Sequence, residues 1–564
     1  MRNTLYTTAV PVMTCGGAFA QANVNESLVQ TTLYVNCMHP NASNGNTGLD
    51  ANYPLLTVSA GVARAKVFIN TYKAGTKVWV FPGVYREAWA DQTGLKLTTA
   101  NAPLVIEGTN GTADEIVLSG SAVMTNGWGA YAAGIYSNYW PYNWGVNTQQ
   151  AQYGNTGLSA RREMLVVNGK LLEQKESVGA LRPGTFCVDE AADRVYIWPA
   201  DGVTVQNVLT ENAVLPRLAR FETSTNIVLR NLTVRHYNLP VWYNTTNPEW
   251  WYQGWGRALV FNSCVNVLVD GCRFEWNNSG GMAFGKSSGN APARQITVTN
   301  SVFRWNGHGG LTGGEFTDAL VVDVEASYNN WRGALAGYYG WSSGGVRFNV
   351  IHRVRLGRVS ARHNWSPGIW LDTDIKDVVV EASKSENNLS TGIFIEKTPG
   401  PCVVSNSVFY GNYKGIKGAD SEQVLIQNNL SWCNGGGQIS FDKNFDPGFA
   451  YTDFETGVAA TSYFRAWDIH SNMLVSSAPQ QMVYQQSGFD WTKYLWNTNI
   501  TTLAARSNHW WNGWNGVVFD VFNAARTNWT GWTNTVRRGG ARLGYGDRWG
   551  DPGLVATAAA GKVA

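Results

Sequence analysis

The sequence predicts an all-β chain, a right-handed, single-stranded parallel β-helix in which each coil of the solenoid corresponds to one sequence repeat. Three observations favour this fold: coils of about 22–25 residues, a composition rich in Gly and Asn, and the lack of long runs of helix-forming residues. The chain has 564 residues, of which 61 are Gly. A solenoid grows by adding repeats to a continuous core, so one fold can extend over a chain of this length.

Each repeat is a short β-rich segment that ends in Asn and is followed, a few residues later, by Gly and an apolar residue. One unit runs from Ile296 to Asn306 and leads to Gly310-Leu311. The closing Asn residues lie at 277, 306, 329, 364, 387, 412 and 434, with successive differences of 29, 23, 35, 23, 25 and 22. This period, with short Val/Ile strands and no helix, is typical of β-helix coils. We expect each buried Asn to hydrogen-bond to its equivalents in the stack and to the turn backbone.

The remaining segments are placed around this solenoid. The pattern within residues 1–21 predicts an export signal, because an apolar run ends in the small-residue sequence Ala18-Phe19-Ala20. Such a signal favours a secreted or periplasmic protein. Residues 22–440 predict the β-helix, with a loop or lobe rich in Trp, Tyr, Asn and Gly inserted near residues 124–165. Residues 441–564 predict irregular, Trp-rich final coils.

Composition and charge argue against two classes of partner. The net charge is +3, with 43 basic and 40 acidic residues, and no basic stripe of the kind that binds nucleic acid is present. The sequence has no apolar run of 18 or more residues, so we expect no membrane span. Its seven Cys residues lack a CxxC pair, which favours buried thiols over disulfides or a metal site. No sequence feature indicates the oligomeric state.

Aligning the coils by their Gly residues brings two carboxylates into register. Asp372 comes four residues after Gly368, and Glu396 comes four residues after Gly392; the two acids are 24 residues apart, which is one coil. Stacked strands predict side chains ~5 Å apart. Retaining glycosidases place a nucleophile and an acid/base at about this separation. The pair therefore indicates a glycosidase site.

Three further positions bear on this pair. The equivalent positions on the neighbouring coils are Gly337 and Ala419, which predicts that the acidic pair is local. Asp374 is predicted to share the face of Asp372 and is an alternative nucleophile, or a group that tunes it. A solvated surface acid or a structural calcium ligand is the competing interpretation for each single carboxylate.

Aromatic residues suggest the class of ligand, since flat indole rings pack on the C–H faces of sugars. The chain has 26 Trp, and many of them lie beside Asn or Gly in predicted turns. For Arg347 and His363 an ordinary surface role is an equal alternative, and His308 is interpreted as a turn residue. The residues predicted to bind substrate are Trp370, Trp365, Arg347, His363, Trp341 and Trp331.

Several motifs resemble those of the β-helical carbohydrate-active enzymes of pectate-lyase-like architecture. Pro82-Gly83-Val84-Tyr85-Arg86 is similar to the opening of such chains. Gly344-Gly345-Val346-Arg347, together with the blocks that end in Asp372 and Glu396, resembles the central region of β-helical glycoside hydrolases, above all β-xylosidases. The resemblance implies Asp372 as the nucleophile and Glu396 as the acid/base. Asp374 departs from that pattern.

The sequence thus predicts a glycoside hydrolase that cleaves a polysaccharide or oligosaccharide by a retaining mechanism, without a cofactor or a metal. One alternative is a lyase or uronate epimerase of the same fold, in which the acids hold Ca²⁺ and Lys397 or Arg347 abstracts a proton. A non-catalytic carbohydrate-binding solenoid is the other alternative. The sugar, the linkage and the choice between exo and endo action are left open.

Overall fold

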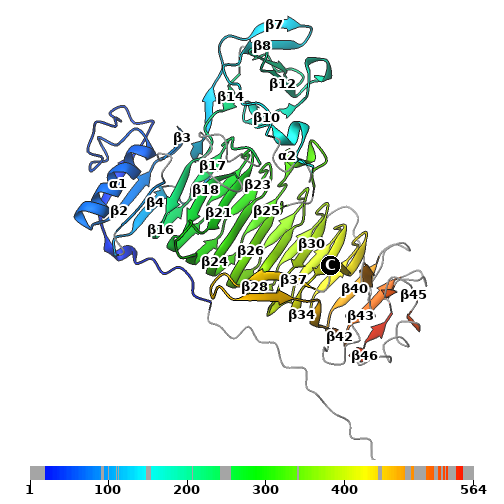
Figure 1. Cartoon of the computed structure of the whole chain (residues 1–564). Coiled ribbons are helices and arrows are strands. Elements are labelled where there is room, and N and C mark those ends of the chain that lie inside the picture. The colour runs from blue at the N-terminus through cyan, green and yellow to red at the C-terminus, as the bar shows by residue number, and fades with distance from the viewer. Residues whose placement is uncertain are drawn as a thin grey trace, which may run out of the picture.

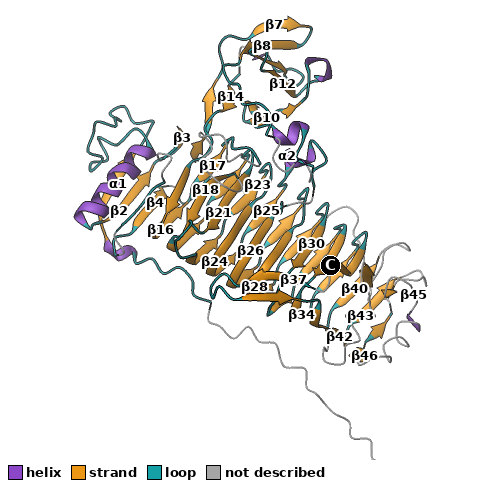
Figure 2. Cartoon of the chain, in the orientation of Figure 1, coloured by secondary structure: helices purple, strands orange, loops and turns teal. Residues whose placement is uncertain are grey.

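The computed structural model describes residues 19–550, apart from 90–93, 99–100, 110, 112, 148–150, 152–153, 206–207, 242–255, 340–341, 443–447, 477–483, 488–502, 513–518, 522–524, 528, 531–541 and 546. Nearly all of its regular structure is β-strand (Figure 2). The strands stack in parallel into one elongated solenoid built of a 23-stranded and a 13-stranded sheet (Figure 1). The predicted parallel β-helix is therefore confirmed.

One coil shows how the chain winds. β21 (Gly280–Gly285) and β22 (Ala293–Thr299) belong to the larger sheet, and β23 (Val302–Arg304) belongs to the smaller one. We call the strands at the start of each coil the first column and those that follow them in the larger sheet the second column. In three central coils the two columns join into long strands: β24 (Leu311–Val322), β26 (Val346–Gly357) and β28 (Ile369–Glu381).

The columns separate again in the coils that follow. The first column continues with β30 (Thr391–Glu396), β33 (Lys414–Ala419) and β36 (Gly437–Asp442). The second column continues with β31 (Cys402–Ser405), β34 (Glu422–Gln427) and β39 (Arg465–His470). Ile369, Ile393, Ile416 and Ile439 stand in register on successive strands and are fully buried, so identical side chains form one layer of the core.

Buried Asn residues line one turn of the stack, as predicted, with one correction. Hydrogen bonds of 2.9–3.0 Å between side-chain amides link Asn277, Asn306 and Asn329, and the ladder continues toward the C-terminal coils. Its next members are Asn364, Asn388, Asn412 and Asn434. The sequence repeat predicts Asn387 as a member of this ladder, but Asn387 takes the left-handed conformation one residue earlier, with φ 54°. Asn388 keeps the spacing at 24 residues on both sides.

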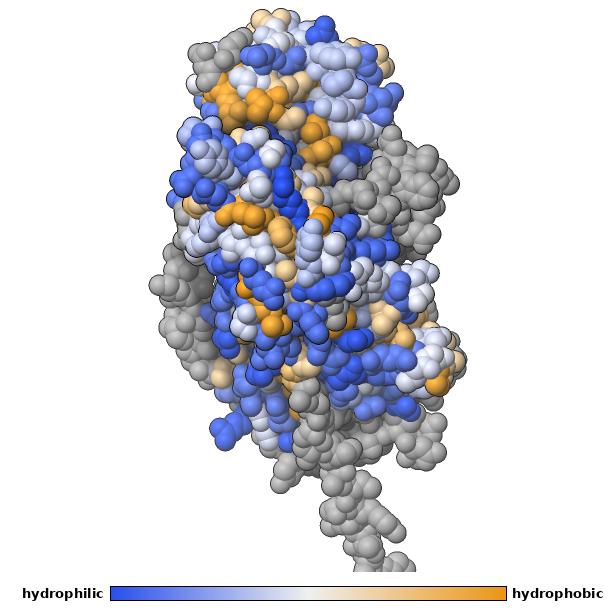
Figure 3. Space-filling view, turned by 90° about the vertical axis from the view of Figure 1, so that its left-hand side faces the viewer, coloured by the Kyte–Doolittle hydropathy of each residue, from blue (hydrophilic) through white to orange (hydrophobic). Residues whose placement is uncertain are grey.

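A helix covers the N-terminal end, where the sequence pattern predicted only strands and turns. α1 (Val58–Tyr72) packs Val62, Ala65 and Ile69 against β1 (Val29–Val35) and β2 (Gly75–Val80). Viewed from this side, the surface is mostly hydrophilic and its hydrophobic patches are separated (Figure 3). α1 therefore covers the first coil and closes the end of the stack, which solenoids require for solubility. Among the described residues, no helix has the length and apolarity to cross a membrane.

A lobe projects from the solenoid near its N-terminal end (Figure 1). It begins at β6 (Ser121–Val123), ends at β14 (Thr210–Ala213), and has two small sheets and its own core around Trp140, Phe186 and Ile197. The segment near 124–165 forms only its first part. Arg332, in α2 (Trp331–Ala334), joins lobe and solenoid: its guanidinium donates to the Glu163 carbonyl at 2.6 Å and to Asn278 at 2.8 Å.

Two antiparallel strands leave the solenoid after β36. β37 (Phe449–Thr452) and β38 (Ala459–Ser462) form a hairpin, which we call the arm, that crosses in front of β28 (Figure 1). Beyond the arm, described strands still stack in both sheets, from β40 (Met473–Ser476) and β43 (His509–Asn512) to β46 (Arg542–Tyr545). Trp467 and Trp510 are buried in this core.

Candidate functional site

The candidate site lies on the outer face of the first column, where alternate side chains of β28 and β30 point away from the core. In β28, Ile369 and Leu371 face inward and are fully buried, so Trp370 and Asp372 face outward. Trp370 is in register with Phe394, and Asp372 with Glu396. The predicted stacking of the two carboxylates is present, and adjacent strands hold them one strand spacing apart, ~4.8 Å.

The residues above and below the pair limit the acidic ladder to two members. Ala419 follows Glu396 in register, as expected. On the other side, Asn349 precedes Asp372, and the expectation of Gly337 at this position is wrong. Gly337 lies just after α2, in a segment between Asn329 and β26 that lengthens this coil, so counting from the wrong Gly displaced the register. The acidic pair remains local.

Asp372 is fixed at both of its oxygens. The Arg347 guanidinium lies 2.7 Å from one oxygen, and the Thr373 hydroxyl donates to the other at 2.8 Å. Arg347 is itself buried; burial lowers its pKa, and the charges of Asp372 and Glu396 act in the opposite direction. A carboxylate held by a cation and a hydroxyl is fixed in its orientation, as a nucleophile requires.

Glu396 has different surroundings. Burial raises the pKa of Glu396 above its usual value, and the negative charge of Asp372 raises it further, against smaller lowering effects of Lys397 and Lys417. The Lys397 ammonium lies 3.4 Å from the Glu396 carboxylate. A raised pKa lets Glu396 keep a proton that it can donate. The two stacked carboxyl groups thus have contrasting surroundings: Asp372 is held by Arg347 and Thr373, and Glu396 has a raised pKa.

The aromatic side chains beside the acids are layered along the stack. Trp370 and Phe394 stack with ring centroids 5.3 Å apart. Arg347 lies over Trp370 at 4.7 Å, and Lys417 lies over Phe394 at 4.1 Å. These cations and rings occupy each other's faces, and Trp370 is buried, including its indole N–H, which has no hydrogen-bond partner among the described residues.

The other aromatic residues predicted to bind substrate form a separate group. His363 continues a stack of parallel rings with Tyr328, 5.0 Å away, and beyond it Trp305 and Trp276. Trp365 lies 5.9 Å from Trp305, and the Trp331 indole donates to the Trp305 carbonyl at 2.8 Å. This group occupies the turn between the smaller sheet and the first column. Trp341 lies outside the described residues.

Asp374 does not share the ladder of Asp372. Thr373 and Asp374 both have left-handed backbone conformations, with φ 56° and 49°, which turns the strand at this corner. Asp374 is buried there and faces the arm: His352 Nε2 lies 3.2 Å from its carboxylate, and the Phe454 amide donates to it at 3.0 Å. The expectation that Asp374 lies on the face of Asp372 is therefore corrected.

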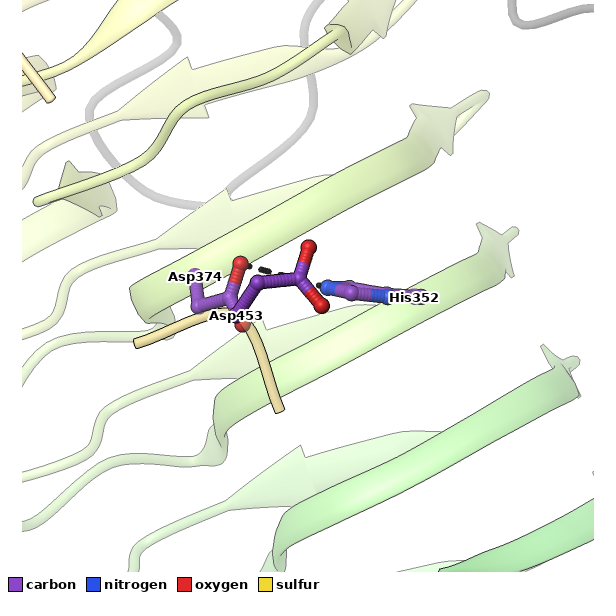
Figure 4. A group of neighbouring side chains, drawn as sticks. All are labelled: His352, Asp374 and Asp453. Atoms are coloured by element: carbon purple, nitrogen blue, oxygen red, sulfur yellow. Dashed lines mark hydrogen bonds and ion pairs between the residues drawn. The ribbon is translucent and has the colours of Figure 1, made fainter. Parts of the chain in front are cut away.

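His352, Asp374 and Asp453 form a cluster that sequence reasoning missed (Figure 4). Each offers one ligand atom, and these atoms lie within 4.8 Å of one another, so the set has suitable donors for a divalent cation. The Lys376 ammonium, however, contacts Asp453 and lies 3.5 Å from Asp374. A side-chain cation thus already offsets part of the negative charge of the cluster. Asp453 comes from the arm, about 80 residues along the chain, so no sequence spacing could have revealed it.

The fold and the stacked outer face define the class: a right-handed parallel β-helix protein with a paired carboxylate site. Residues 257–457, which contain this site, match the family model described as "Right handed beta helix region". No curated protein sequence matches the chain.

Solved structures share the fold at low sequence identity. XylC in complex with xylose is 12% identical, with a TM-score of 0.61 over 94% of this chain and 88% of that chain. The A-module of mannuronan C-5 epimerase AlgE6 from Azotobacter vinelandii is 12% identical, with a TM-score of 0.49 over 92% and 100%. GH136 lacto-N-biosidase from Eubacterium ramulus is 11% identical, with a TM-score of 0.44 over 81% and 65%.

Proposed function

We propose that the protein is a glycoside hydrolase that cleaves a polysaccharide or oligosaccharide by a retaining two-carboxylate mechanism. The observation that carries this proposal is the register of Asp372 with Glu396 on adjacent strands, in contrasting electrostatic surroundings. One strand spacing is close to the ~5–5.5 Å that separates the two carboxyl groups of retaining enzymes, and too short for the water that an inverting enzyme places between them.

The roles follow from the contacts. Asp372, held by Arg347 and Thr373, attacks the anomeric carbon while protonated Glu396 gives its proton to the leaving oxygen. Glu396, now ionised, takes a proton from the water that hydrolyses the glycosyl-enzyme. The positive charges of Lys397 and Lys417 stabilise Glu396 in this ionised form. No step needs a cofactor.

The substrate class rests on the site and on the fold. XylC, whose solved structure contains xylose, shares this fold over most of both chains. Together with the carboxylate pair, this supports a carbohydrate substrate, and a xylan-type saccharide is the first to test. We also propose that the protein acts outside the cytoplasm, in the periplasm or after secretion. N-terminal sequencing of the protein expressed in its host would detect removal of the leader.

A calcium-dependent lyase or uronate epimerase of the same fold is the second candidate. The observation that favours it is the presence of basic groups in the same site: Arg347 lies against Asp372, and Lys397 lies 3.4 Å from Glu396. A uronate substrate would need such cations, and proton abstraction would need one of them to be neutral.

Product release from xylans, arabinans, pectins and alginate, with and without chelator, separates these reactions. The wild type is compared with Glu396→Gln and Asp372→Asn. Reducing sugar that resists chelator and is lost in both variants supports the hydrolase. A chelator-sensitive rise in ultraviolet absorbance, from an unsaturated product, would instead indicate the lyase. Saccharide binding that survives both substitutions, without any product, would leave a binding solenoid.

A further inference from the structure

The arm returns over coils that precede it in the chain. It leaves the solenoid after β36, yet its turn reaches His352 and Arg353 in β26, four strands earlier in the stack. On the way, Phe449 packs under Lys397, with 5.0 Å between the ammonium and the ring centroid, and Tyr451 lies 5.8 Å from the Lys376 ammonium. The arm thus runs along the corner at which the first column ends.

This path brings the arm beside the carboxylate pair. Lys397, which contacts Phe449, is also the ion-pair partner of Glu396. Asp374, which accepts the Phe454 amide, is two residues from Asp372. One side chain, Lys397, therefore connects Glu396 to the arm, and the arm lies beside the site on the corner side.

Charged residues at the arm's turn fix it to the solenoid. Glu455 binds His352 Nδ1 at 2.5 Å and Arg353 at 2.7 Å. Hydrogen bonding by Arg353 lowers the pKa of Glu455 to about 2, so this carboxylate is ionised at neutral pH. Asp453 pairs with Lys376, and the His352 ring lies 4.4 Å from Phe454. We call these contacts the clasp.

The arm also carries a recess of its own. Residues of both strands line a shallow, open hollow of about 380 Å³. Its wall combines one aromatic ring with hydroxyl and methyl groups, which suits the apolar faces and polar rims of sugar rings. The lining residues are Ala450, Tyr451, Thr452, Ala459, Ala460 and Thr461.

We propose that the arm forms an additional saccharide subsite beside the carboxylate pair, and that the clasp holds this subsite in place. The proposal rests on the proposed hydrolase function, because it places the second sugar unit next to a reacting one. The arm would bind saccharides longer than a monosaccharide and contribute little to the bond-breaking step. Loss of the arm's contacts should therefore weaken the binding of oligosaccharides and leave turnover of a monosaccharide aryl glycoside unchanged.

Two variants test the two parts of this proposal. Tyr451→Ala removes the aromatic ring of the hollow, and Glu455→Gln removes the charge that binds His352 and Arg353. Asp323→Asn is the matched control: it also loses one carboxylate charge paired with an arginine, Arg358, on the solenoid surface away from the arm. The probes are xylo-oligosaccharides and an aryl β-xyloside.

Hydrogen–deuterium exchange without substrate examines the clasp separately from activity. Glu455→Gln should raise exchange in residues 449–462 about tenfold, with β30 and β33 unchanged, and Asp323→Asn should have no effect there. In kinetics, both arm variants should raise KM for oligosaccharides three- to tenfold and keep kcat for the aryl xyloside within twofold.

The failures of the two proposals are distinguishable. Exchange in the arm that equals that of the wild type would overturn the clasp, whatever the activity. An unchanged KM in Tyr451→Ala would overturn the subsite in an active enzyme. If the wild type hydrolyses nothing, isothermal titration with the same oligosaccharides decides: binding weakened by Tyr451→Ala supports the subsite, and no binding, or equal binding, refutes it.

Discussion

Asp372 and Glu396 occupy the same position on two adjacent strands, but their carboxyl groups lie in opposite electrostatic surroundings. Arg347 and Thr373 bind the two oxygens of Asp372, whereas burial and the charge of Asp372 raise the pKa of Glu396. The same strand position thus has two different environments, because the neighbouring residues differ between coils.

The first prediction concerns the division of roles between the carboxylates. Glu396→Gln should lower kcat/KM by about 10²–10⁴ on natural glycosides, since it removes the proton donor. On an aryl glycoside with an acidic phenol as leaving group, the loss should be much smaller, because that group departs without protonation. Asp372→Asn should abolish turnover of both substrates. Equal losses on both substrates in Glu396→Gln would contradict its assignment as the acid.

The pH dependence of the rate gives a second prediction. Because its pKa is raised, Glu396 stays protonated to a higher pH than an ordinary Glu, and activity should fall only as the pH rises through that raised pKa. Removing the positive charge of Lys417, in Lys417→Met, should move this alkaline limb to higher pH, since Lys417 lowers the pKa of Glu396. A kcat/KM profile over pH 4–9 measures both effects, and an alkaline limb that stays in place or moves to lower pH would refute the second.

Arg347 should be needed for both activity and stability. Arg347→Met leaves Asp372 buried without its cation and removes the group stacked on Trp370. Breaking one side of a buried ion pair typically costs about 3–5 kcal/mol. We expect a clearly lower melting temperature and at least a hundredfold loss of kcat/KM. Arg355→Met is the control, because its ion pair with Glu381 is largely exposed and should contribute about 1 kcal/mol or less.

The sequence repeats predicted the fold and the pairing of Asp372 with Glu396, because both depend on spacings no longer than one coil. The 24-residue spacing of Asp372 and Glu396 equals a coil in which neither turn carries an insertion, so the register could be counted. The same count gave Gly337 where Asn349 stands, since the segment around α2 lengthens that coil. Asp374 could not be placed, because its partners Phe454 and His352 come from a distant arm and another coil.

The Asn ladder provides a fourth prediction, which tests the assignment of Asn388 over its neighbour. The Asn388 side chain accepts from the Asn364 amide at 3.1 Å and from the Asn364 side chain at 2.8 Å. It also donates to the Ala361 carbonyl and to Asn412.

At ~1 kcal/mol for each hydrogen bond, Asn388→Ala should lower the free energy of unfolding by about 3–4 kcal/mol. Asn387→Gly should be nearly neutral, because Gly tolerates the left-handed conformation. Thermal unfolding compares the two, and equal losses would contradict the assignment.

The cap at the N-terminal end should be sensitive to pH. The Glu87 carboxylate accepts from the Val58 and Ser59 amides at the start of α1. Burial nevertheless raises the pKa of Glu87 to about 7, against the lowering by these N–H donors. A raised folded-state pKa means that the stabilisation is complete below the usual pKa of a Glu and is lost as the pH rises through about 7. Ionisation above that pH should cost roughly 3 kcal/mol.

Hydrogen exchange in α1 should therefore increase between pH 5 and pH 8 in the wild type, after correction for the intrinsic rate. The increase should be much smaller in Glu87→Gln. Exchange in β30 serves as the internal reference, because its contacts lie far along the stack from α1. If α1 exchanged at the same corrected rate at both pH values, Glu87 would be shown to stay ionised throughout this range, with its N–H donors outweighing its burial.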